Sequence, residues 1–109
     1  MAKWKKFSIP LTTTDLLDVK LEVENGKVTG FALNYRTKIG GNYHEVYRVD
    51  TAHGQLHEQK YWISPYPIPL KALVGDINYN ATFYVLEIKK NFERYKKYFL
   101  GKRGETHEV

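Results

Sequence analysis

The spacing of apolar residues changes partway along this chain, and that change restricts the possible folds more than any other feature. Across residues 7–62 apolar and polar side chains alternate, which is typical of half-buried β-strands. Three prolines at alternate positions in the segment 64–69 then exclude both a helix and a central strand. Across residues 78–100 apolar side chains recur every three or four positions, which predicts one long amphipathic helix.

The chain is therefore predicted to be α+β, with an antiparallel β-meander of four to five strands followed by one long C-terminal α-helix packed on the sheet. Its 109 residues suit a single domain, 1–109, and residues 101–109 are expected to form a mobile tail after the helix ends at Gly101. The apolar stripe of the helix consists of Ala81, Val85, Ile88, Phe92, Tyr95 and Phe99. We expect it to pack on a sheet face that holds several of Val19, Leu21, Phe31 and Leu33.

The dipeptide Asn25-Gly26 predicts a tight hairpin with a two-residue loop. In a regular hairpin Leu21 would lie opposite Gly30, and the apolar residues from Phe31 onward would point to the other side of the sheet. Either both faces are then partly covered, or a β-bulge at Thr29–Gly30 restores the alternation. A glycine within a strand favours the bulge.

The composition excludes several kinds of site and favours one kind of partner. The chain has no cysteine, which rules out disulfides, thiolate metal sites and cysteine nucleophiles. No apolar run approaches ~18 residues and no apolar signal segment opens the chain, so we expect a cytoplasmic protein without membrane contact. Seventeen Lys and Arg against twelve Asp and Glu give a net charge of +5, which favours RNA or another polyanion as partner.

A group of polar residues surrounds a predicted turn at His53–Gly54. Such a turn would place Asp50 directly opposite His57 on the next strand. Strand alternation would also place His44, Arg48 and Asp50 on one face of the sheet. That face would then carry a carboxylate able to orient an imidazole, and a guanidinium able to bind phosphate.

Four interpretations of this group remain open. The first is a structural polar ladder in which Asp50 and His57 form a cross-strand pair. The second is metal-independent RNA cleavage with catalytic residues His44, Arg48, Asp50 and His57. There one histidine would take the proton of the 2′-hydroxyl, the other would protonate the leaving oxygen, and Arg48 would stabilise the charge on phosphorus.

The third interpretation is nucleic-acid binding without chemistry, through Arg48 and His53 together with a basic helical stripe of Lys90, Arg94 and Lys97. The fourth is a divalent metal held by Asp50, His53 and His57. Ligands spaced in this way lie together on a helix, but they do not across a turn and a strand, so we expect no metal and no cofactor.

The segment from Tyr47 to His57 resembles the pattern R-x-D-x-A-H-G-x-x-H of uncharacterised small prokaryotic domain families. More loosely, it is similar to the TumE-type toxins of toxin–antitoxin pairs. The resemblance covers only this segment. It implies that Arg48, Asp50, His53 and His57 form a polar signature, and that an antitoxin-like protein is a candidate partner.

The sequence therefore predicts a small basic protein that binds or acts on RNA, with a toxin-like ribonuclease as the catalytic form of that function. Whether the chain is an enzyme stays open. The alternative is a non-catalytic interaction module that forms a homodimer or binds a protein partner. Nine tyrosines, five phenylalanines and two tryptophans favour an aromatic sheet surface for such contacts.

Overall fold

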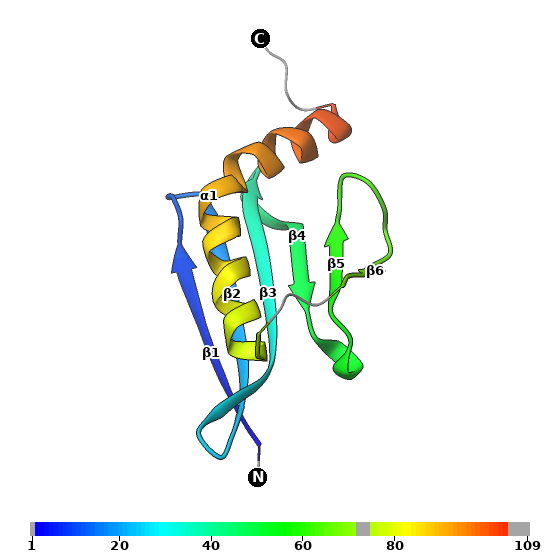
Figure 1. The fold of residues 1–109 in the computed structure, drawn as a ribbon. Coiled ribbons are helices and arrows are strands. Elements are labelled where there is room, and N and C mark those ends of the chain that lie inside the picture. Colours follow the sequence, from blue (N-terminus) through cyan, green and yellow to red (C-terminus); the bar gives the residue numbers. More distant parts are fainter. Residues whose placement is uncertain (1, 72–74, 105–109) are drawn as a thin grey trace.

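The computed structural model describes residues 2–71 and 75–104, and in it an antiparallel six-stranded sheet carries a long helix on one face (Figure 1). The strands lie side by side in chain order: β1 Lys3–Pro10, β2 Asp15–Glu24, β3 Lys27–Ile39, β4 Asn42–Asp50, β5 His57–Lys60 and β6 Ile68–Pro69. A 3-10 turn, η1 Ala52–Gly54, joins β4 to β5, and the helix α1 spans Ile77–Arg103. The predicted α+β meander with a C-terminal helix is confirmed. The two residues of β6, within the proline segment, add a short strand at one edge.

A β-bulge in β3 places the apolar residues of the first hairpin on one face. Glu22 pairs with Gly30 and Val23 pairs with Val28, so Thr29 is the extra residue. Beyond the bulge Leu21 lies opposite Phe31, and the next pairs on the same face, Val19 with Leu33 and Leu17 with Tyr35, are also apolar. The bulge predicted at Thr29–Gly30 is confirmed.

A second bulge, which the sequence analysis does not predict, lies in β4. Tyr35 pairs with Tyr47 and Arg36 pairs with Glu45, so Val46 is the extra residue in this strand. Residues of β4 before Val46 therefore point to the opposite face from the one that simple alternation gives them.

The helix extends beyond its predicted C-terminal end. It begins after Asp76, whose carboxylate accepts a hydrogen bond of 2.8 Å from the backbone N–H of Tyr79. The expected end at Gly101 is wrong, because Gly101 is helical and Gly104, with a φ of 75°, adopts the left-handed conformation that ends helices. Residues 101–103, which the sequence assigns to the tail, belong to the helix, and residues 105–109 lie outside the described part.

The core forms between α1 and the sheet, as the apolar stripe predicts. Ile88 is completely buried, and the ring of Phe92 meets the ring of Tyr35 edge-on at 5.7 Å. Phe92 itself is only partly buried. On the sheet side the buried residues are Leu17, Val19, Phe31, Leu33, Tyr35, Val46, Tyr47 and Val49.

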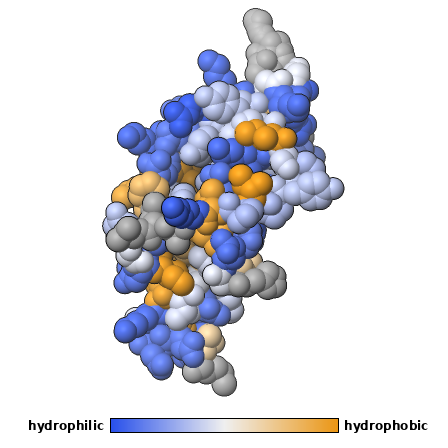
Figure 2. Space-filling view, turned by 45° about the vertical axis from the view of Figure 1, so that its right-hand side comes forward, coloured by the Kyte–Doolittle hydropathy of each residue, from blue (hydrophilic) through white to orange (hydrophobic). Residues whose placement is uncertain are grey.

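The positive charge of the chain is concentrated on the helix. Seven of the 17 basic residues and two of the 12 acidic residues lie on α1, so α1 carries the whole excess of five charges. In Figure 2 the upper part of the molecule, around the end of α1, is mostly hydrophilic in colour. Within residues 2–71 and 75–104, no helix has the length and hydropathy needed to cross a bilayer.

Candidate functional site

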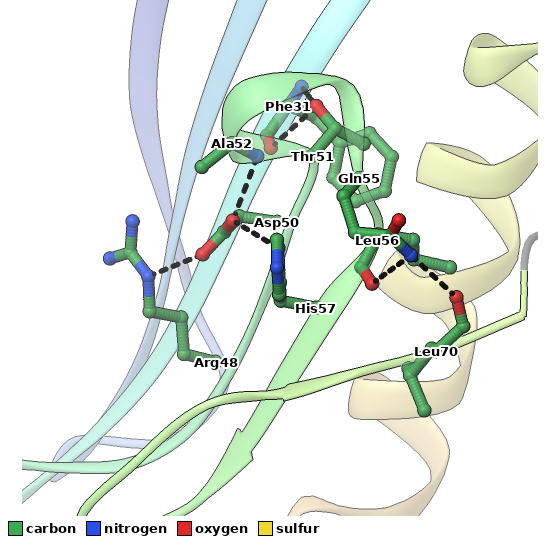
Figure 3. Close-up of polar contacts among 9 residues, drawn as sticks. All are labelled: Phe31, Arg48, Asp50, Thr51, Ala52, Gln55, Leu56, His57 and Leu70. Carbon is green, nitrogen blue, oxygen red and sulfur yellow. Dashed lines mark hydrogen bonds and ion pairs between the residues drawn. The ribbon is translucent and has the colours of Figure 1, made fainter.

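The third hairpin has the predicted pairing of Asp50 with His57. Asp50 is 9% exposed, and its carboxylate accepts hydrogen bonds from Arg48 Nε at 2.8 Å and from the backbone N–H of Ala52 at 2.9 Å. The Nδ1 atom of His57 lies 4.0 Å from the same carboxylate (Figure 3). Asp50 therefore holds three parts of the hairpin together.

The connection between β4 and β5 is wider than the predicted two-residue turn. Thr51 extends the sheet beyond β4, because its N–H donates to the carbonyl of Phe31 at 3.0 Å and its hydroxyl accepts from the N–H of Phe31 at 2.9 Å. The 3-10 turn follows, and it ends at Gly54 with a φ of 73°, a conformation that favours glycine. Asp50, Ala52 and Gly54 of the R-x-D-x-A-H-G-x-x-H segment therefore shape the connection between β4 and β5.

His44 does not lie with Arg48 and Asp50, so the predicted shared face is wrong. The bulge at Val46 reverses the direction of His44, which pairs with Thr37 on the face that α1 covers. There His44 Nδ1 lies 3.0 Å from a guanidinium nitrogen of Arg103, on the helix. Arg48 and Asp50 lie on the other side of the sheet.

The basic stripe of Lys90, Arg94 and Lys97 lies on the exposed surface of α1 and does not join Arg48. The sheet separates the two groups, so a single short ligand does not reach both. The side chain of His53 lies outside the described part of the structure, and its predicted roles are not placed. Among the residues that are described, no group of three or more His, Asp or Glu has an arrangement that could hold a metal ion.

The side of the sheet away from α1, here called the open face, consists of cross-strand rows. One row contains Lys6, Lys20, Ala32, Asp50 and His57. The next row contains Ser8, Asp18, Asn34, Arg48 and Gln59. A shorter row at the other side contains Trp4, Glu22 and Gly30. The open face is therefore polar, with small residues on its central strand.

A depression of about 600 Å³ extends from the open face, around the end of the sheet, to the start of α1. From the open face its lining includes Trp4, Lys20, Glu22, Ala32 and Arg48, and from α1 it includes Ile77 and Asn80. Trp4 is 50% exposed, and Lys20 Nζ lies 4.5 Å from the centre of its ring.

A second depression, of about 470 Å³, continues over Lys6, Ser8 and Asp18 and shares Lys20, Ala32 and Arg48 with the first. Trp4, Lys6 and Lys20 join this site, although the sequence does not predict them as its members. Strand alternation on β1 and β2 could have placed them there, once the successive pairing of β1, β2, β3 and β4 was known.

The carboxylates of the open face engage only part of the guanidinium of Arg48. The Nε atom of Arg48 binds Asp50, and its two terminal nitrogens point away from that carboxylate (Figure 3). Asp18 forms an ion pair with Arg36, accepts a hydrogen bond of 3.2 Å from a terminal nitrogen of that guanidinium, and accepts another from the hydroxyl of Ser8 at 2.7 Å. Asp18 and Asp50 are thus already engaged beside the cations that line the depressions, and Glu22, a third carboxylate in the lining, accepts from the hydroxyl of Thr29 at 2.9 Å.

A second polar cluster lies under α1 at the other end of the sheet. Asp15 is 3% exposed and accepts from the hydroxyl of Tyr35 at 2.5 Å, from Thr12 at 2.5 Å and from Lys96 Nζ at 3.3 Å. Burial opposes ionisation of Asp15. The hydrogen bonds of Thr12 and Tyr35 and the charge of Lys96 outweigh it and lower the pKa to about 2. The carboxylate of Asp15 accepts from Tyr35 on β3 and from Lys96 on α1, so it joins the helix to the sheet.

Comparison with known families gives a match over nearly the whole chain. The model of a family described as Domain of unknown function (DUF7718) matches residues 2–105, so the chain belongs to that family. No curated protein and no solved structure matches it.

Proposed function

We propose that this member of the DUF7718 family binds single-stranded RNA on the open face of its sheet. The observation that carries the proposal is the depression of about 600 Å³ beside an exposed indole ring and a guanidinium whose terminal nitrogens are free of Asp50. An aromatic ring stacks on any unpaired base, and cations along a groove bind the phosphates between bases. The residues assigned to binding are Trp4, Lys6, Lys20 and Arg48.

The size of the depression supports a nucleotide as the bound unit. Small-molecule sites commonly occupy ~300–1,000 Å³, and Ala32, a small residue of the central strand, lines both depressions. The second depression leads from Arg48 and Lys20 toward Lys6, which gives a path for the neighbouring phosphate. A duplex would not fit this mode, because its bases are stacked on one another.

Binding is favoured over cleavage by the position of the two histidines. Metal-independent cleavage needs one group to accept a proton and a second to donate one on the other side of the phosphate. His57 lies beside Arg48 and Asp50, whereas His44 lies on the covered face of the sheet. The toxin-like ribonuclease remains the second candidate because Arg48, Asp50 and His57 converge, but it lacks His44 as a partner.

The test measures binding of a fluorescent, unstructured RNA decamer at several salt concentrations. Trp4→Ala should raise Kd roughly 5- to 150-fold, the loss of one base stack. Arg48→Gln should make the salt dependence less steep by roughly 0.7 in the slope of log K against log salt, since one phosphate contact is lost.

Arg94→Gln is the matched control, because it removes one positive charge from the exposed surface of α1. Its Kd should stay within about twofold of the wild type, since charge effects are screened beyond about 10 Å in ordinary salt. If Arg94→Gln weakens binding as much as Arg48→Gln does, and Trp4→Ala has no effect, the helix is the interface and the open face is not.

A further inference from the structure

The two edges of the sheet differ in the length of strand that they present, although both carry a proline and β1 also carries Lys3, Lys5 and Lys6. At one edge β6 has only two residues, and one of them is Pro69. At the other edge β1 has eight residues, and all of them except Ile9 are exposed. A long exposed edge strand presents a row of backbone hydrogen-bonding groups that another strand can meet.

The outward groups of β1 follow from its pairing with β2. The N–H of Leu11 donates to the carbonyl of Asp15 at 2.8 Å, next to the pair of Pro10 with Leu16. In an antiparallel ladder this means that the odd-numbered residues of β1 bond to β2 and the even-numbered residues point outward. Trp4, Lys6 and Ser8 therefore present N–H groups at the edge. Pro10, which has no N–H, also faces outward, where it breaks no bond to β2.

We propose that β1 pairs with β1 of a second copy of this chain, antiparallel, with Phe7 opposite Phe7 at a two-fold axis. In this register Lys6 lies opposite Ser8 and Trp4 lies opposite Pro10. Each outward N–H of Trp4, Lys6 and Ser8 then meets an outward carbonyl of the other copy. The proposal concerns the edge of the sheet and does not depend on RNA binding.

Charge selects this register over its neighbours. Moving one strand by two residues in one direction places Lys6 opposite Lys6 of the other copy. Like charges directly opposite each other are destabilising. Moving them in the other direction leaves the N–H of Trp4 without a carbonyl, because its partner position falls beyond Pro10. In the proposed register the remaining lysines face uncharged residues, with Lys5 opposite Ile9.

Apolar surface beside the edge supports the same partner. Phe7 is 49% exposed and Leu86, on the adjoining turn of α1, is 59% exposed. Both line an apolar groove of about 180 Å³ between β1 and α1, together with Ile9 and Val85. A Phe7–Phe7 pair of the closely spaced, non-hydrogen-bonded kind would cover both rings and the mouth of this groove.

A single engineered thiol tests the register, because the chain has no cysteine. Phe7→Cys should form an interchain disulfide under mild oxidation, since the two Cα atoms would lie ~4.5 Å apart, within the range for disulfides. Lys3→Cys is the matched control on the same strand. Its two thiols would be separated by roughly eight residues of strand, about 27 Å, and should not cross-link. Equal cross-linking of both variants, or none of Phe7→Cys, would overturn the proposal.

Sedimentation of the unmodified protein provides the second test. The wild type should sediment at twice the 12.8 kDa of one chain. Ser8→Pro should be monomeric, because it removes an outward N–H and leaves the bonds to β2 intact. Ser8→Ala keeps that N–H, loses the same hydroxyl contact with Asp18, and should remain dimeric. A monomeric wild type, or a dimeric Ser8→Pro, contradicts the pairing, while RNA binding by monomers would leave the open-face proposal intact.

Discussion

The carboxylate of Asp50 accepts a hydrogen bond of 2.9 Å from the backbone N–H of Ala52, two residues further along the chain. This contact closes the entry to the 3-10 turn, and the other carboxylate oxygen binds Arg48 Nε at 2.8 Å. The same side chain thus shapes the hairpin and sets the position of a proposed RNA-binding residue. Asp50 acts through these contacts, so it is a residue that positions Arg48.

Substitutions of Asp50 separate its two contacts. Asp50→Ala removes both and should lower the free energy of unfolding by about 2–3 kcal/mol, since a mostly buried charged acceptor is lost. Asp50→Asn keeps an acceptor for Ala52 and should cost about half as much. Chemical denaturation measures both values. RNA affinity should fall in Asp50→Ala, because Arg48 is no longer held in place, and unchanged affinity would contradict the positioning role.

Acid should destabilise the protein through Asp15. Its pKa of about 2 in the folded protein lies below the ordinary value of 3.8. The carboxylate therefore stabilises the fold above the unfolded pKa, and this contribution of about 2 kcal/mol is lost as pH falls from about 4 toward 2. Denaturation midpoints measured from pH 6 to pH 2 check this.

Lys96→Met provides the comparison for the acid series, because it removes the cation next to Asp15 and preserves an unbranched side chain. It should raise the pKa of Asp15 and reduce the acid-dependent part of the stability. Identical pH profiles for the variant and the wild type would show that Lys96 does not stabilise the charged carboxylate.

Ile88 should be the most sensitive position of the helix. It is completely buried between α1 and the sheet, so Ile88→Ala should cost about 2–5 kcal/mol of unfolding free energy. Ile63→Ala removes the same atoms from a side chain that is 67% exposed and should cost less than about 0.5 kcal/mol. Similar losses at both positions would be inconsistent with the packing of α1.

RNA should remain intact in the presence of the protein. Labelled RNA incubated for hours with excess chelator should show no cleavage, because His44 and His57 lie on opposite faces of the sheet. His44→Ala should leave RNA affinity unchanged. Cleavage that disappears in both His44→Ala and His57→Ala would instead support the ribonuclease.

The Asp50–His57 pairing and the bulge at Thr29–Gly30 could be predicted because both depend on neighbouring segments. Alternation on each strand and the Asn25-Gly26 turn are local properties, and they determine which residues face each other across a hairpin. The shared face of His44 and Arg48 could not be predicted in the same way. It depends on one extra residue, Val46, that no glycine or turn signal marks.

By itself the sequence determined the order of elements, the helix stripe and the hairpin pairs, because apolar period and turn residues act over a few positions. Only the tertiary structure decided which polar residues share a surface. Trp4 and Arg48 lie far apart in the chain and line one depression because β1 to β4 pair in order and two bulges set their registers. A shift of one residue in any of these pairs moves every later side chain to the other face, so the site follows from the complete sheet.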